Sequence, residues 1–259
     1  LSGLTNLQNL NCSSNNFTSL NVADLINLQI LDCHNNSSYI GTLDLSGLTS
    51  LKQLNCSNIS LSTLITNGLI NLQQLDCSDN GLTELNLKDL INLVNLNCSI
   101  NYIVTLDISN FVNLQVLNCS NNSKMKSLNV KGAIQLQNLN CRANPLESID
   151  LNGLTSLTNI NLDYNRSLLS LYMKEIGFDS TNPTHTFDFN TQFALRYICA
   201  SPSLIPYMQQ RANQYGYNPM GYCLVIDSSC SSDPYNEAIV AIPDLNFKNS
   251  LLNSDCIYV

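Results

Sequence analysis

The chain of 259 residues has no tryptophan, and only 12% of its residues are charged, about half of the usual quarter. No apolar run reaches about 18 residues, so the sequence predicts no transmembrane helix. The first residues lack the basic start and the apolar stretch of a secretory signal peptide, and we expect none in this chain. Because leucine is abundant and charge is low, the composition also argues against intrinsic disorder.

Positive charge is especially scarce. Lysine and arginine number 11 against 19 acidic residues, which gives a net charge of −8. Residues 1–174 carry 11 acids and 8 bases, and residues 175–259 carry 8 acids and 3 bases. Neither part offers the basic stripe that would neutralise a phosphate backbone. We therefore expect neither nucleic acid nor an anionic membrane surface as a partner, and no insertion into a membrane.

Motifs of known chemistry are missing as well. The two histidines, His34 and His185, belong to no H-E-x-x-H motif, and the sequence has no G-x-S-x-G and no glycine-rich phosphate loop. It also lacks a calcium loop of alternating aspartates and any C-x-x-C pair that would suggest zinc. We expect no enzymatic activity, no cofactor and no metal site.

Leucine and asparagine are abundant, with 44 and 40 residues, and they recur at a fixed period. The pattern L-x-x-L-x-C-x-x-N recurs in eight units, with exceptions at Ile59, Ile160 and Leu162. The units open at Leu7, Leu28, Leu51, Leu72, Leu93, Leu114, Leu136 and Leu157. The successive steps are 21, 23, 21, 21, 21, 22 and 21 residues. Such a period indicates one supersecondary unit that is stacked many times.

The arrangement of one unit follows from the alternation of side chains along a strand. In Leu10-Asn11-Cys12 the leucine and the cysteine share one face, and the asparagine points to the other. A single unit cannot cover its own apolar face, so neighbouring units must stack. A second apolar pair predicts a short strand on the opposite wall, at Leu20-x-Val22, Leu43-x-Leu45, Leu85-x-Leu87, Leu106-x-Ile108, Leu128-x-Val130 and Ile149-x-Leu151. Unit 3 departs from this pattern, because Leu64-Ile65-Thr66 puts an apolar residue outward and a polar one inward.

The repeat resembles that of leucine-rich repeat proteins over residues 1–174. It is similar to the short repeats of about 21 residues in secreted bacterial surface proteins, especially those of Bacteroidetes type. The resemblance implies a right-handed leucine-rich-repeat solenoid with two parallel β-sheets, whose first unit is truncated. It also implies a secreted or cell-surface location and a role in binding.

An asparagine stands at the ninth position of seven units, and only Ile59 departs from this column. A side-chain amide both donates and accepts hydrogen bonds, so it can satisfy backbone groups in a buried turn. We interpret the column as part of the scaffold, as in the resembling family. Ile59 should leave a local defect, which Asn58 is a candidate to cover.

Seven of the 11 cysteines occupy the sixth position of the repeat, and we expect them to be free thiols packed as small apolar side chains. The four cysteines of the tail, Cys199, Cys223, Cys230 and Cys256, lie outside the repeats and permit three pairings. We favour Cys199 with Cys223 and Cys230 with Cys256, as disulfides of a secreted protein.

After Met173 the period stops and the composition changes. Residues 195–199 are typical of a strand, residues 204–215 of a helix and residues 222–226 of a second strand. This order predicts a β-α-β segment over 175–232 that caps the solenoid. Residues 233–259 read as a linker or the start of a next block, since 241–248 resembles a segment that precedes such repeats. The chain begins inside a unit, so we expect it to be a fragment of a longer protein.

Repeat proteins usually bind through side chains that project from their strands. Here most of these positions are Asn or Ser, which favours a solvated polar surface. Residues that depart from this pattern are the candidates for ligand binding: Asp32, His34, Asp76, Arg142, Asp163 and Tyr164. We expect a protein or a glycan as the ligand, and a structural spacer that positions other domains is the alternative. Open solenoid edges also predict some self-association, which scattering of a monodisperse monomer would contradict.

Overall fold

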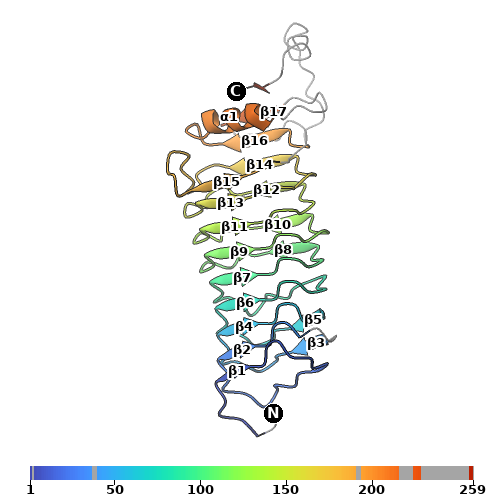
Figure 1. Cartoon of the computed structure of the whole chain (residues 1–259). Coiled ribbons are helices and arrows are strands. Elements are labelled where there is room, and N and C mark those ends of the chain that lie inside the picture. Colours follow the sequence, from blue (N-terminus) through green and yellow to red (C-terminus); the bar gives the residue numbers. More distant parts are fainter. Residues whose placement is uncertain (2, 37–39, 191–193, 216–223, 229–256, 259) are drawn as a thin grey trace.

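The computed structural model describes residues 1, 3–36, 40–190, 194–215, 224–228 and 257–258. The chain winds into a long coil, with each turn stacked on the one before it (Figure 1). One wall of the coil is a parallel sheet of nine strands, which we call the first sheet. Its strands are, in order, β1 (Asn9–Asn11), β2 (Ile30–Asp32), β4 (Gln53–Asn55), β6 (Gln74–Asp76), β7 (Asn95–Asn97), β9 (Val116–Asn118), β11 (Asn138–Asn140), β13 (Asn159–Asn161) and β15 (Thr186–Asp188). The predicted solenoid of stacked repeats is confirmed.

The strands of the first sheet share one register, and this register builds the core. Leu31 of β2 pairs with Leu54 of β4, which in turn pairs with Leu75 of β6. These leucines are at most 2% exposed, and the cysteines two positions further on, such as Cys77, are fully buried. Because the register repeats from turn to turn, the buried side chains form continuous columns along the coil.

The second wall is divided into three parts, where we expected one continuous sheet. They are β3 (Gly41–Asp44) with β5 (Leu61–Ile65), β8 (Thr105–Asp107) with β10 (Ser127–Asn129), and β12 (Ser148–Asp150) with β14 (Ser170–Met173), β16 (Tyr197–Ala200), β17 (Leu224–Asp227) and β18 (Ile257–Tyr258).

Two of the expected strands on this wall do not form, at residues 20–22 and 85–87. The second gap has a visible cause in unit 3. Thr66 points inward, as predicted, and its hydroxyl donates a hydrogen bond of 2.8 Å to the backbone carbonyl of Asn86. That carbonyl is thereby bonded to a side chain, and β5 also carries a register shift against β3 at Gly41 and Thr42.

The ninth-position asparagines form the predicted hydrogen-bonded stack. Asn122 is fully buried, and its Nδ2 donates to the carbonyls of Cys119, at 2.9 Å, and of Cys98 in the preceding turn, at 3.1 Å. Its Oδ1 accepts from the backbone nitrogen of Ile103 at 3.0 Å. Each amide of this kind therefore links two turns of the coil.

Ile59 interrupts this stack, but Asn58 does not replace the missing amide. Asn58 is exposed and donates instead to Oδ1 of Asn35 at 2.9 Å. The backbone of unit 3 is served from the next turn, because Oδ1 of Asn80 accepts from the nitrogens of Ile59 and Leu61. The expectation for Asn58 was therefore wrong, since this side chain points out of the turn.

The coil continues beyond the repeats that the sequence marks. β15 joins the first sheet next to β13, with Phe187 opposite Ile160. Phe187 and Phe189 are buried in place of a leucine and a cysteine, and their ring centroids lie 4.9 Å apart. The aromatic rings thus extend the apolar columns by one turn.

A helix and two parallel strands close the C-terminal end, as predicted. α1 (Ile205–Tyr215) follows β16, and β17 pairs with β16 in parallel. Figure 1 shows α1 lying beside β16 and β17 at this end of the coil. Leu204, Met208 and Ala212 are buried at one helical spacing, so one side of α1 packs on the core. No helix in the described part of the chain is long and apolar enough to cross a membrane.

Candidate functional site

Two columns of side chains stand on the outer side of the first eight strands of the first sheet, β1 to β13, which we call the amide face. The column before the buried leucines consists of Asn9, Ile30, Gln53, Gln74, Asn95, Val116, Asn138 and Asn159. The column after them consists of Asn11, Asp32, Asn55, Asp76, Asn97, Asn118, Asn140 and Asn161. Because the strands are parallel and in register, each column repeats at about 4.8 Å.

Hydrogen bonds within each turn hold the second column in place. Oδ1 of Asp76 accepts from the backbone nitrogen of Ser78 at 3.0 Å and from its hydroxyl at 2.6 Å. The same two bonds join a serine to the outward residue of four other turns, at Asn11, Asn55, Asn97 and Asn118. The recurring serine is therefore a positioning residue. These side chains are held in place by hydrogen bonds within their own turns.

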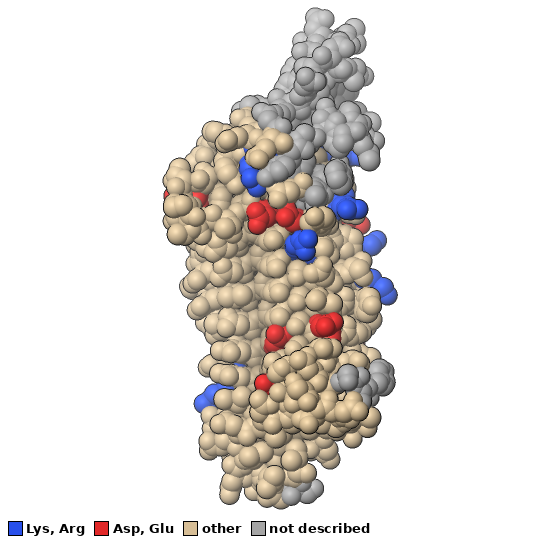
Figure 2. Space-filling model, in the orientation of Figure 1, with Lys and Arg blue, Asp and Glu red and all other residues tan. Residues whose placement is uncertain are grey.

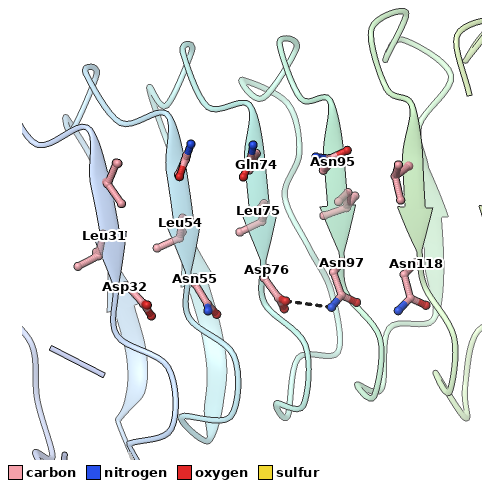
Figure 3. A pocket seen from close by; sticks show the side chains of 14 residues that line it. Leu31, Asp32, Leu54, Asn55, Gln74, Leu75, Asp76, Asn95, Asn97 and Asn118 are labelled. Carbon is pink, nitrogen blue, oxygen red and sulfur yellow. Dashed lines mark hydrogen bonds between the residues drawn. The ribbon is translucent and has the colours of Figure 1, made fainter. Parts of the chain in front are cut away.

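A shallow groove of about 500 Å³ runs along the amide face across β2, β4, β6, β7 and β9. Figure 3 shows Gln74 and Asn95 toward one end of the strands, and Asp76 and Asn97 toward the other end of the same face. Nδ2 of Asn97 donates to Oδ2 of Asp76 at 3.0 Å. Since the leucine between the two columns is buried, the backbone of the strands forms the floor of the groove.

Three of the predicted ligand-binding residues lie at this groove or beside it. Asp32 and Asp76 both line it, with Asn55 between them. Oδ1 of Asp32 lies 2.5 Å from Nδ1 of His34, and the side chains are 25% and 30% exposed. Asp32 therefore holds His34 in one orientation, at the N-terminal end of the groove.

The other three predicted residues lie at the opposite end of the coil, in units 7 and 8. The guanidinium of Arg142 lies over the ring of Tyr164, 4.5 Å from its centroid. The carboxylate of Asp163 accepts a hydrogen bond from the backbone nitrogen of Asn190, so it serves the junction with the turn after β15. The structure thus gathers Arg142 with Tyr164, and it directs Asp163 to a scaffold contact.

Charge concentrates at this C-terminal end. Figure 2 shows a face that is mostly uncharged, with acidic and basic side chains next to one another near the C-terminal end. Partial burial raises the pKa of Asp188, the nearby Asp163 raises it further, and Arg211 opposes the shift. Nη2 of Arg211 donates to the carbonyl of Phe187 at 3.2 Å. These groups tie α1 to β15.

Sequence reasoning missed two residues near Arg142. Arg166 and Ala143 line the same hollow as Arg142 and Tyr164, at the corner where the chain leaves the first sheet. A signal for Ala143 was present, because it is the smallest side chain at the eighth position of any unit. Arg166 carried no such signal, since the tenth position of the repeat varies.

The ladder cysteines are free thiols, as predicted. They are Cys12, Cys33, Cys56, Cys77, Cys98, Cys119 and Cys141, and all but Cys12 are buried. Burial raises the pKa of Cys98 and Cys141 to about 12. Within the described ranges no three His, Cys, Asp or Glu residues are grouped as a metal site requires.

Of the four tail cysteines, one lies among the described residues. Cys199 is buried in β16 and is not among the free thiols, while Cys223, Cys230 and Cys256 lie outside the described residues. Both proposed pairings therefore stay predictions. The linker or next block expected over 233–259 lies almost wholly outside the described residues as well.

No protein-family model and no curated protein matches the sequence. Among solved structures, the chain is similar to the functional domain of InlJ from Listeria monocytogenes, at 24% identity over 76% of this chain and 54% of that one, with a TM-score of 0.46. It is similar to the LRIM1/APL1C complex at 20% identity, over 84% and 51%, with a TM-score of 0.46. A repeat protein from Leptospira interrogans matches at 18% identity, over 99% and 84%, with a TM-score of 0.38. The chain spans about half the length of the first two.

Proposed function

We propose that this leucine-rich-repeat solenoid is a non-catalytic protein-binding module of a secreted or cell-surface bacterial protein. The observation that carries the proposal is the groove of about 500 Å³ on the amide face, which crosses five strands. Its two rims present amides and carboxylates at a regular spacing, so it offers one continuous polar surface to a partner.

Preorganisation of the rims supports binding. A side chain that is already fixed loses little entropy when a partner arrives. Asp76 accepts three hydrogen bonds from Ser78 and Asn97, and both Asp76 and Asn97 are half-buried. The polar groups of the groove therefore keep one arrangement, which favours a specific partner over a loose association.

The chemistry of the face favours a protein as partner. Ile30 and Val116 are 37% exposed at the two ends of the groove, and carboxylates and amides lie between them. Mixed apolar and polar groups of this kind are typical of protein interfaces. A glycan would meet no exposed aromatic ring among the residues that line the groove.

The buried ladder thiols are compatible with the secreted or surface location that we propose. Burial raises the pKa of Cys33 to about 12, and the other buried ladder cysteines are shifted in the same direction. The thiolate is the reactive form, so these cysteines are protected in an oxidising environment. The ladder is thus compatible with export despite its free thiols.

A capture experiment with two matched variants tests the binding function. Gln74→Trp places a large side chain on the rim of the groove, while Ser127→Trp places the same side chain at an exposed position of β10 on the second wall. Extracellular and surface proteins retained on the immobilised chain are identified by mass spectrometry. We expect a protein that the unmodified chain and Ser127→Trp retain and that Gln74→Trp loses.

A structural spacer is the second candidate, and the nine-stranded first sheet favours it. A parallel sheet with one uninterrupted core makes a stiff rod that can hold other domains apart. A spacer predicts that no retained protein depends on Gln74. Turnover of any substrate in a broad hydrolase screen would instead contradict the non-catalytic assignment.

A further inference from the structure

A hollow of about 400 Å³ lies at the corner where three successive turns leave the first sheet. The turn residue at this corner has a left-handed backbone in each unit, with φ of 57° at Asn121, 58° at Ala143 and 60° at Tyr164. Ala143 places only a methyl group between the larger side chains of Asn121 and Tyr164. The hollow is therefore the space that a longer side chain at residue 143 would fill.

Arg142 presents its cation to this hollow. It is half-buried, and its guanidinium lies 4.5 Å from the centroid of the Tyr164 ring. Its backbone donates to Oδ1 of Asn140 and accepts from the backbone nitrogen of Asn121. Its side chain forms no ion pair with any described residue. A guanidinium carries five N–H donors in a planar fork that matches a carboxylate. The stacked ring holds that fork in one orientation.

The remaining lining adds a second positive charge and polar groups. Arg166 lies on the same hollow, together with the hydroxyls of Ser123 and Ser167. No acidic side chain is among the described residues that line it. In a chain of net charge −8, two arginines that line one hollow are a local concentration of positive charge.

We infer that the hollow binds the carboxylate of a glutamate or aspartate on a peptide segment of the partner protein, an inference that rests on the proposed binding function. Arg142 donates two parallel hydrogen bonds to the two carboxylate oxygens, and Arg166 supplies the second charge. Charge-assisted bidentate bonds of this kind are the stronger ones in proteins. The site therefore fixes one end of the partner beside the amide face.

Two observations favour a single peptide carboxylate, the first over a polyanion and the second over a sugar. Asp163 and Asp188 lie at the same end of the coil, and the whole chain is acidic, so a polymer with many negative charges is repelled. In addition, the guanidinium of Arg142 already lies over one face of the Tyr164 ring. That leaves less aromatic surface for a stacked sugar.

Titration of the ¹⁵N-labelled chain with the capped peptide Gly-Glu-Gly tests the inference. The shifts of the Arg142 Nε–H and of the Ala143 backbone amide report on the hollow. We expect saturable shifts with a dissociation constant on the order of 1 mM, and about tenfold weaker binding of the peptide Gly-Gln-Gly. Arg142→Gln and Ala143→Leu should both abolish the shifts. The larger side chain should fit the fold, because unit 5 carries Ile100 at the same turn position.

Lys124→Gln is the matched control. Lys124 lies over the ring of Tyr102, 5.6 Å from its centroid, but it does not line the hollow. Its replacement should leave the titration unchanged. Equal binding of the two peptides, or no saturable shift, would overturn the inference. Tighter binding of methyl glucuronide or sulfate than of Gly-Glu-Gly would overturn the assignment to a peptide.

The peptide titration and the capture experiment test the hollow and the proposed function separately. If no peptide shifts are seen but a protein is still captured in a Gln74-dependent way, the inference about the hollow is contradicted. The proposed binding function is then unaffected. If the peptide shifts saturate but no protein is captured in a Gln74-dependent way, the proposed binding function is contradicted. The role that we give to the hollow, which depends on a partner protein, is then contradicted as well.

Discussion

At the scale of single residues, the ninth-position asparagines do more than fill a turn. Oδ1 of Asn144 accepts from the backbone nitrogen of Asn122, at 2.8 Å, while Nδ2 of Asn144 donates to Cys119 and Cys141. One amide thus satisfies backbone groups of two turns in the buried interior. Since a buried group without a partner is costly, this column is as important to the coil as the leucines.

Replacement of Asn122 by alanine tests this view. The variant removes three hydrogen bonds and leaves the carbonyls of Cys98 and Cys119 and the nitrogen of Ile103 with fewer partners. We expect a loss of about 2–4 kcal/mol in the free energy of unfolding, measured by urea denaturation. Asn113→Ala, at an exposed position, should change it by less than about 0.5 kcal/mol. Equal effects of the two substitutions would contradict the role of the column.

The ladder thiols predict a dependence of stability on alkaline pH. Burial raises the pKa of Cys98 from 9.0 to about 12, so the folded chain keeps the proton that the unfolded chain loses. The stabilisation is complete below pH 9 and is lost as the pH rises toward 12. We expect Cys98→Ala to lose less stability than the unmodified chain between these two pH values. A parallel decline of both in urea titrations would show that the thiol is not involved.

At the scale of elements, the sequence predicts the first sheet because its eight repeat units map directly onto the first eight strands of that sheet, from β1 to β13. The repeat pattern does not predict the ninth strand, β15, and the reason is physical. Phe187 takes the place of a leucine, and the register step from Ile160 to Phe187 is 27 residues, because the turn near Asn182 and His185 is inserted. An aromatic ring fills the same column, but it breaks the sequence pattern.

The second wall and the site were less predictable. Leu85 and Leu87 have the pattern of a strand, yet the carbonyl of Asn86 bonds to Thr66, and no strand forms. The sequence points to Arg142 and Tyr164 because they depart from the Asn and Ser residues at most outward positions of the repeat. That they stack on one another depends on the turn at the corner, and the sequence does not show that Arg166 reaches the same hollow.

Close approach between turns is a property of particular glycines. A Cβ on Gly132, which has φ of +98°, would lie 2.5 Å from the carbonyl oxygen of Ser109, whereas one on Gly153, with φ of +76°, would meet nothing within 4 Å. Gly153→Ala should therefore cost only the backbone strain, about 1–2 kcal/mol. Gly132→Ala should cost clearly more, because one turn must move away from the next. Similar urea midpoints for both variants would contradict this contact.

At the scale of the whole molecule, different residues of each turn build the core and the outer surface. The buried columns and the asparagine stack hold the turns together, and the outer residues are free to differ from turn to turn. Asp32 and His34 lie near one end of the amide face, and Arg142 and Tyr164 lie near the other.

The binding claim is tested most directly by site-specific photo-cross-linking. A benzophenone side chain is introduced in place of Gln74 on the amide face and, separately, in place of Ser127 on the second wall. After irradiation with extracellular and surface proteins, cross-linked products are identified by mass spectrometry. The account predicts a specific protein cross-linked from residue 74 and not from residue 127. Products from residue 127 alone, or the same products from both positions, would contradict it.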